Sequence, residues 1–159
     1  MSSSFQRPNP KGFKITAKAA GHYVNSILAS QEAKAKGFDE ALLSDMNGFV
    51  AEGPGANLFC EKNGRLYTPS LGNILPGITR ATVLEICEEL GIEVVEKQIS
   101  TEELKNADAA FFCGTAAEVI GFESLDDYKF PLDWNLSLSR KIQVEYKNRV
   151  CEGVLVSSE

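Results

Sequence analysis

The sequence predicts a single domain of mixed α/β class. Two pairs of short apolar segments are joined by Asn-Gly turns, at Asn47-Gly48 and at Asn63-Gly64, and this dipeptide strongly favours β-hairpins. Around these hairpins, apolar residues recur at helical spacing and are bounded by capping signals. The chain has 159 residues, of which 43% are hydrophobic and 24% charged, so it has the size and composition of one ordinary globular domain.

The first twelve residues are expected to lack regular structure. They include three serines, two prolines and a glycine, a composition typical of linkers. We therefore interpret residues 1–12 as a linker or an expression remnant, which suggests that another segment once preceded it. The domain then spans residues 13–159, beginning with an extended segment from Phe13 to Lys18 and a helix over 22–36 that Gly37 ends.

The two hairpins occupy the centre of the sequence. In the first, Ala41–Asp45 returns into Phe49–Glu52, and in the second, Asn57–Glu61 returns into Arg65–Thr68. Strand and helix signals then alternate, with a capping box at Ser100 and Glu103. The expected elements are a helix from its N-cap Thr79 to Leu90, a strand over Ile92–Gln98, a short helix after Ser100, a strand over Ala109–Cys113 and a last helix over Leu136–Val150. No structure is predicted for the loop before that helix.

Charge and hydropathy exclude several classes of partner. The formal net charge is −6 and the pI is near 4.9, and the sequence contains no cluster of Lys and Arg that would attract nucleic acid or an anionic membrane. No apolar run approaches the roughly eighteen residues of a membrane span, and the polar start does not resemble a signal peptide. We therefore expect a cytoplasmic protein that binds neither nucleic acid nor membranes.

The cysteines do not indicate a metal site. They are far apart in the sequence, form no C-x-x-C pair, and have a single histidine, His22, to assist them. We expect no bound metal and interpret the cysteines as reduced thiols in the core of an intracellular protein. They are Cys60, Cys87, Cys113 and Cys151.

A lysine and a glutamate stand in segments rich in small residues. Lys18 is surrounded by alanines and a glycine, which leave room for a bulky ligand, and a desolvated lysine amine can attack an aldehyde to form a Schiff base. Glu52 precedes a Gly-Pro-Gly turn, and a glutamate beside a pyridine nitrogen keeps that nitrogen protonated, as pyridoxal phosphate requires. Taken alone, either residue could be an ordinary solvated charge.

Two further segments could seat anions. Leu75–Arg80 is a tight turn that runs into a helix, whose free amides and the Thr79 hydroxyl could hold a phosphate. Cys113–Glu118 ends a buried strand in a turn of small residues whose amides could bind an anion. The alternatives are an ordinary capped helix start and a plain strand-to-helix turn. Together, an amine, a carboxylate and two anion seats are what binding of pyridoxal phosphate needs.

These four segments resemble the fold-type IV pyridoxal-phosphate enzymes and, within them, the bacterial branched-chain amino acid aminotransferases. The run that begins at Lys18 resembles the Schiff-base lysine segment of that family, and Glu52–Phe59 resembles its pyridine-nitrogen glutamate segment. Leu75–Arg80 is similar to its phosphate turn and Cys113–Glu118 to its second anion turn. The matches follow the family's order over roughly residues 13–125.

The resemblance implies the large domain of the D-amino acid aminotransferase-like fold, in which hairpin-rich sheets form a pseudo-barrel with flanking helices. Residues 13–159 would be this cofactor-binding domain. The family's smaller N-terminal domain, which supplies an arginine to the phosphate and much of the apolar substrate pocket, would be missing. The resemblance also implies a homodimer, and a chain that is inactive without its missing half.

At the ring of the cofactor, pyridoxal 5′-phosphate, the resemblance implies four roles. Lys18 would form the Schiff base and carry the proton between the substrate α-carbon and C4′ of the cofactor. Tyr23 would hydrogen-bond the phenolic oxygen. Glu52 would pair with the pyridinium nitrogen, and Leu75 would pack on the ring.

At the phosphate, the resemblance implies that the Ile78 and Thr79 amides and the Thr79 hydroxyl bind, together with Thr115. The amides of Thr115 and Ala116 would meet the substrate carboxylate. The implied reaction is a ping-pong exchange of an amino group between leucine, isoleucine or valine and 2-oxoglutarate. Two alternatives remain open: a D-amino acid aminotransferase or aminodeoxychorismate lyase of the same family, and a non-catalytic binding or oligomerisation domain on the same scaffold.

Overall fold

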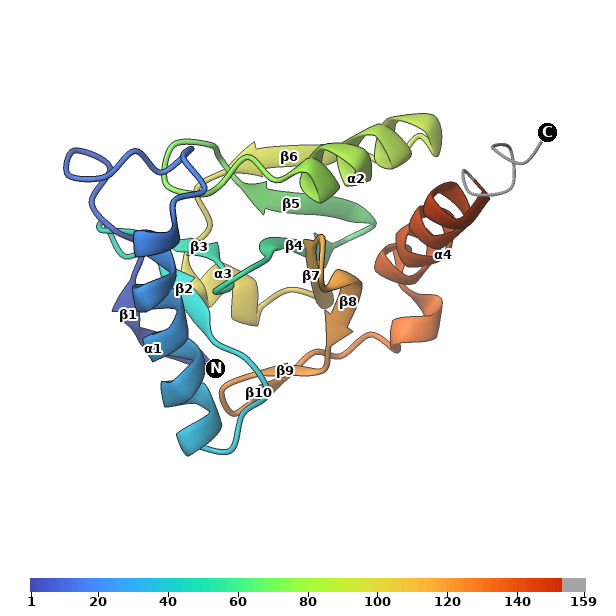
Figure 1. Ribbon diagram of the computed structural model, residues 1–159. Coiled ribbons are helices and arrows are strands. Elements are labelled where there is room, and N and C mark those ends of the chain that lie inside the picture. The colour runs from blue at the N-terminus through green and yellow to red at the C-terminus, as the bar shows by residue number, and fades with distance from the viewer. Residues whose placement is uncertain (153–159) are drawn as a thin grey trace.

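A strongly curled sheet with helices around it forms the body of the molecule (Figure 1). The computed structural model describes residues 1–152, and within this range eight strands form one sheet in the order β1-β2-β3-β4-β5-β6, with β7 paired to β4 and β8 paired to β7. These strands are β1 (Ser2–Gln6), β2 (Leu42–Ser44), β3 (Val50–Glu52), β4 (Asn57–Lys62), β5 (Arg65–Pro69), β6 (Val94–Lys97), β7 (Ala109–Gly114) and β8 (Glu118–Phe122). The predicted mixed α/β class is confirmed.

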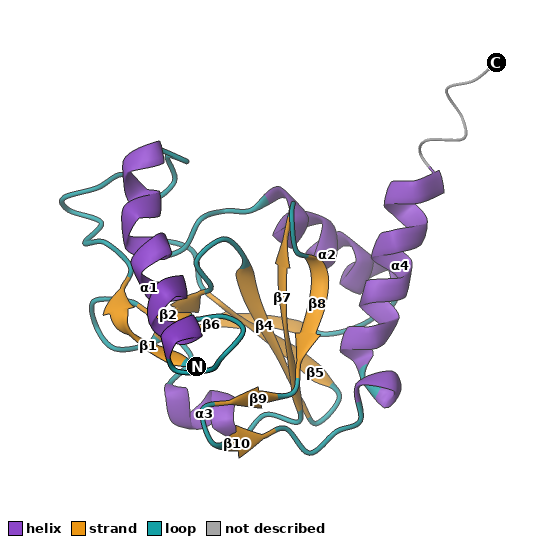
Figure 2. Cartoon of the chain, turned by 60° about the horizontal axis from the view of Figure 1, so that its bottom comes forward, coloured by secondary structure: helices purple, strands orange, loops and turns teal. Residues whose placement is uncertain are grey.

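The helices lie on both sides of this sheet (Figure 2). Helix α1 packs against β1. On the other side, α2 packs against β7, α4 packs against β7 and β8, and the two helices pack against each other. The helical elements are η1 (Ala20–His22), α1 (Tyr23–Ala35), α2 (Ile78–Glu89), α3 (Thr101–Lys105), η2 (Trp134–Leu136) and α4 (Leu138–Glu152). Over residues 1–152, no helix is both long and apolar enough to cross a bilayer.

Local signals placed most of these elements correctly. Both hairpins are present, and the second turns through Asn63 and Gly64 with φ of 52° and 74°, the left-handed conformations that a type I′ turn requires. The capping box is also confirmed: Glu103 N donates to Ser100 Oγ at 3.1 Å, and Ser100 N donates to the Glu103 carboxylate at 3.0 Å. The unpredicted loop contains β8 and a two-stranded hairpin of β9 (Ser124–Leu125) and β10 (Tyr128–Lys129).

The prediction that residues 1–12 lack regular structure is wrong for Ser2–Gln6. This segment is strand β1, parallel to β2. Distant partners hold it: the Ser2 amide and hydroxyl donate to Asp126 at 2.6 and 2.8 Å, and Arg7 N donates to Ser44 O at 2.7 Å. Local composition does not reveal such contacts. A linker role for residues 1–12 remains a prediction.

The extended segment predicted from Phe13 to Lys18 is also wrong. The chain turns here instead, and Ala17 N donates to Lys14 O at 2.9 Å. Alternation of apolar residues over six positions is too short a pattern to separate a strand from a folded loop.

The two central strands, β4 and β7, are buried on both faces. On one face Leu58 and Cys60 join Phe112 in one apolar cluster, and on the other Phe59 stacks on Phe111 with ring centroids 5.0 Å apart. This two-sided burial fixes the position of β4, and its first residue, Asn57, lies at the edge of the core where the site begins.

Three of the four cysteines are buried thiols, as predicted, but Cys151 is exposed on α4. The prediction of a core thiol is therefore wrong for Cys151. We expect one thiol per native chain to react rapidly with Ellman's reagent and four after unfolding. Burial raises the pKa of Cys60 and Cys113 to about 12, and thiols react as thiolates. Fast reaction of a second thiol in the native protein would contradict this packing.

Candidate active site

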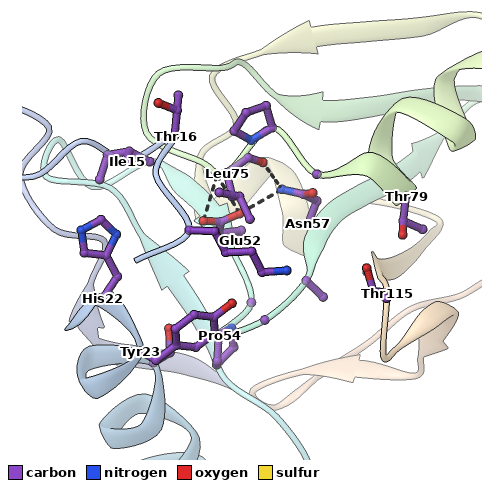
Figure 3. A pocket seen from close by; sticks show the side chains of 18 of the residues that line it. Ile15, Thr16, His22, Tyr23, Glu52, Pro54, Asn57, Leu75, Thr79 and Thr115 are labelled. Carbon is purple, nitrogen blue, oxygen red and sulfur yellow. Dashed lines mark hydrogen bonds between the residues drawn. The ribbon is translucent and has the colours of Figure 1, made fainter. Parts of the chain in front are cut away.

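A cavity of about 250 Å³ opens where the four chemically suggestive segments meet (Figure 3). Seven of the eight residues singled out in the sequence line it, whereas Ala116 is exposed and lies outside the lining. The seven are Lys18, Tyr23, Glu52, Leu75, Ile78, Thr79 and Thr115.

The register of the sheet brings two of these segments together at Asn57. This first residue of β4 pairs with Glu52 of β3 on one edge and with Cys113 of β7 on the other. Residues opposite each other in antiparallel strands lie about 5 Å apart. The glutamate segment and the turn after Cys113 therefore flank Asn57.

The Asn57 side chain joins a third segment to this arrangement. Its Nδ2 donates to Glu52 Oε2 and to the Leu75 carbonyl, both at 2.9 Å (Figure 3). Because both partners are acceptors, the amide nitrogen must face them. Asn57 thus connects the glutamate, the turn at Leu75 and the end of β7.

Gly77 packs so closely on Asn57 that only glycine fits. A Cβ atom on Gly77 would lie 2.3 Å from Asn57 Oδ1. We expect Gly77→Ala to lower the free energy of unfolding by about 1–3 kcal/mol, because the Asn57 amide must leave its two acceptors. Denaturant unfolding measures this. The matched control is Gly55→Ala in the same cavity, where an added Cβ meets no atom within 4 Å, and equal stabilities of the two variants would refute the contact.

Glu52 is a buried carboxylate that faces hydrogen-bond donors and an arginine. Leu75 N lies 3.2 Å from both carboxylate oxygens, and Arg7 Nε lies 2.9 Å from Oε1 with both side chains less than 10% exposed. Burial raises the pKa of Glu52 to about 7, and the positive charge of Arg7 opposes this rise. Because this pKa is close to neutral pH, the ionised fraction of Glu52 at pH 7 depends strongly on the charge of Arg7.

The start of α2 forms the opposite end of the cavity. Gly77 is the N-cap, no side chain caps the helix, and Ala81 N donates the first helical hydrogen bond to Gly77 O at 3.1 Å. The amides of residues 78–80 consequently have no helical partner and lie at the positive end of the helix dipole. This end of the cavity is suited to an anion.

Thr79 is the second residue of α2, so its prediction as the N-cap is wrong. The helix begins earlier because Gly77 is extended and accepts the bond from Ala81. The Thr79 side chain is buried and turns its hydroxyl toward the cavity, where the Thr115 hydroxyl faces it from the turn after β7 (Figure 3). The two hydroxyls therefore face the same part of the cavity.

Lys18 and Tyr23 lie at the mouth of the cavity. Lys18 follows the turn at Ala17 and precedes η1, and it is exposed, as is Tyr23 at the start of α1. Small residues beside Lys18, including Ala17 and Ala19, also line the cavity. The described residues therefore give the amine access to a ligand, but they do not bury it.

Sequence reasoning missed two residues of this site. Asn57 stood inside a segment that was singled out, but its role depends on the pairing of three strands. Arg7 lies in the segment interpreted as a linker, and no local pattern distinguishes it. Arg7 also lines the cavity.

Comparison with known proteins identifies close relatives. A family model described as amino-transferase class IV matches residues 1–125. A curated branched-chain-amino-acid aminotransferase of Pseudomonas aeruginosa is 44% identical over 144 residues, which make up 91% of this chain and 47% of that protein. The chain therefore spans about half the length of the curated relatives it matches.

Two solved structures share the fold closely. A branched-chain aminotransferase from Thermoproteus uzoniensis with norvaline has a TM-score of 0.89 and 42% identity, covering 94% of this chain and 50% of the other. The holo-form, with PLP, of a branched-chain amino acid aminotransferase from Thermobaculum terrenum has a TM-score of 0.91 and 38% identity, covering 94% and 49%. At 42% and 38% identity over 94% of this chain, the similarity covers the amino-acid sequence as well as the fold.

Proposed function

Because this chain belongs to the amino-transferase class IV family, we propose that it is the cofactor-binding large domain of a branched-chain amino acid aminotransferase. Its substrates are leucine, isoleucine or valine and 2-oxoglutarate, and its cofactor is pyridoxal 5′-phosphate. The observation that carries this proposal is the meeting of four separated segments around one cavity. The names of the relatives support the choice of substrate.

The residues of the cavity fit this cofactor. A buried carboxylate lies at one end, a helix start with a buried threonine at the other, and an accessible amine at the mouth. A volume of about 250 Å³ is close to the lower end, roughly 300 Å³, of small-molecule sites. When bound, pyridoxal phosphate supplies an electron sink for the charge left on the substrate α-carbon.

Each residue then has a defined task. Glu52 holds a positive charge on the ring nitrogen, and Leu75 packs on the ring face. The amides of Ile78 and Thr79, with the Thr79 and Thr115 hydroxyls, bind the phosphate through the helix start. Lys18 anchors the cofactor covalently and moves a proton between the substrate α-carbon and C4′.

Tyr23 donates to the phenolic oxygen of the ring in this proposal. The amides of Thr115 and Ala116 bind the substrate carboxylate. Since Ala116 does not line the cavity, its amide would act at the rim, where the substrate enters.

A further part of the enzyme is proposed to cover the open side of the site. On α1, Val24, Ile27 and Leu28 are 61%, 54% and 42% exposed, and clustered apolar side chains of this kind usually contact other protein. This supports an additional N-terminal domain and a homodimer. A cytoplasmic location also stays a proposal, supported by three buried free thiols.

The substrate assignment can be tested by fusing the N-terminal half of the Pseudomonas aeruginosa relative to this chain. We expect the fused protein to transaminate L-leucine with 2-oxoglutarate and the chain alone to be much slower. D-alanine and aminodeoxychorismate serve as comparison substrates. Faster turnover of either would favour the corresponding alternative activity, and a folded but inactive fusion would favour a non-catalytic domain.

A further inference from the structure

The buried ion pair between Arg7 and Glu52 has no part in the proposed transamination. Arg7 follows β1, whereas Glu52 ends β3, so the pair joins two parts of the sheet that are distant in sequence. The side chains are 7% and 5% exposed, and Arg7 Nε lies 2.9 Å from Glu52 Oε1. A buried pair of this kind is seldom a net gain in stability, since both charges lose their hydration.

The surroundings of Glu52 are arranged for the charged form of the acid. Its hydrogen-bond donors among residues 1–152 are the Asn57 amide and Leu75 N. Arg7 faces it as an ion-pair partner, and the buried Arg7 Nε makes no hydrogen bond to it. A protonated Glu52 would need an acceptor for its own O–H. Burial acts in the opposite direction and favours the neutral acid.

Arg7 is the only one of these three partners that carries a charge. Among other charged groups, Arg80 of α2 also acts on Glu52 but forms its own ion pair with Glu96 at 2.6 Å. Lys18 and His22 line the same cavity at its mouth. The balance between burial and ionisation at Glu52 therefore depends mainly on Arg7.

We propose that Arg7 is a positioning residue that keeps Glu52 ionised and directed into the cavity, and thereby sets how strongly the site retains a cofactor with a protonated ring nitrogen. The effect on cofactor retention rests on the proposed function. The ionisation of Glu52 is a property of the chain by itself, so the two effects can be tested separately.

The charge of Glu52 can be measured without cofactor. In protein labelled with ¹³C at the glutamate carboxyl carbon, the Glu52 signal is assigned by its loss in Glu52→Gln and followed with pH. The wild-type midpoint should lie near pH 7, and Arg7→Met should raise it by about one unit or more, because a cation at this distance lowers a carboxyl pKa by about 1–3 units. Arg7→Gln provides a second neutral variant, in case the methionine variant does not fold.

Arg65→Met is the matched control. It removes an arginine from a surface ion pair with Glu93, in which both side chains are 55% exposed. This control should leave the Glu52 midpoint unchanged. An unchanged midpoint in both neutral Arg7 variants would overturn the proposal.

The effect on the ring nitrogen is tested by equilibrium dialysis at pH 7. Pyridoxal phosphate is compared with an analogue in which C–H replaces the ring nitrogen. A rise of one pKa unit lowers the ionised fraction of Glu52 from about a half to about a tenth, so Arg7→Met should weaken pyridoxal phosphate binding about fivefold. Binding of the analogue should change much less.

The outcomes distinguish the role of Arg7 from the proposed cofactor-binding function. Equal weakening of both compounds would show that Arg7 acts on packing alone, which overturns the proposal. If the wild-type chain binds neither compound while the Glu52 midpoint still shifts, the proposed function fails and only the control of charge by Arg7 survives. Selective loss of pyridoxal phosphate supports both.

Discussion

Replacing Lys18 by alanine is expected to abolish the visible absorption band that pyridoxal phosphate acquires on this chain. That band requires a covalent link to an amine, and Lys18 lies at the mouth of the cavity. In the fused protein, transamination should fall by roughly four orders of magnitude or more, because losing a covalent nucleophile removes a whole catalytic step. A cofactor titration followed by absorbance, and the leucine assay, measure the two effects.

Lys14→Ala is the control for this experiment. Lys14 is also exposed and lies just before Lys18, but it does not line the cavity. Its spectrum and activity should match the wild type. If Lys18→Ala and the wild type absorb alike, Lys18 is not the anchor, and a binding or oligomerisation domain becomes the better interpretation.

Glu52→Gln is expected to lower transamination in the fused protein by roughly two orders of magnitude or more. A neutral amide cannot stabilise a positive charge on the ring nitrogen, and that charge makes the ring an effective electron sink. Glu61→Gln is the control, since Glu61 is equally buried but contacts Ser139 at the start of α4 rather than the cavity. Near-normal turnover of Glu52→Gln would refute the assigned role.

The same variant has a predictable effect on the pH dependence of stability. The pKa of Glu52 is raised from 4.5 to about 7 in the folded chain. The folded state therefore binds the proton more tightly than the unfolded state, so the contribution of Glu52 is fully present below about pH 4.5 and is lost as the pH rises through about 7. Glutamine has no such dependence.

Between pH 4.5 and pH 8, the free energy of unfolding of Glu52→Gln should thus rise relative to wild type by on the order of 1–3 kcal/mol. Urea unfolding at several pH values measures the difference. Both proteins share every other titrating group, so the contributions of those groups to the pH dependence largely cancel in the difference between the two unfolding free energies. A difference that stays constant with pH would show that the folded-state pKa of Glu52 is not raised.

Elements that are stabilised by residues close to one another in the sequence were predictable from the sequence. The hairpin through Asn63 and Gly64 follows from the backbone conformations these residues tolerate, and the capping box at Ser100 and Glu103 follows from two local hydrogen bonds. The boundaries of α1 and α4 followed from apolar spacing to within two residues. In each case, the stabilising interaction lies within a few residues of the signal.

Elements held by distant partners were not predictable from local patterns. Strand β1 exists because β2 and Asp126 satisfy its polar groups, whereas its serine-rich composition alone favours irregular chain. The helix start at Gly77, rather than Thr79, also depends on tertiary packing, since Gly77 must fit against Asn57.

By itself, the sequence determined which residues could carry the chemistry: an amine at Lys18, an acid at Glu52 and an anion-binding turn into a helix within Leu75–Arg80. Only the tertiary structure decided that these groups share one cavity, that Asn57 connects them, and that Arg7 faces the acid. The physical reason is that side-chain identity and local turn geometry are encoded over a few residues. The charge of a buried acid is set by strands and loops that meet only when the whole sheet has formed.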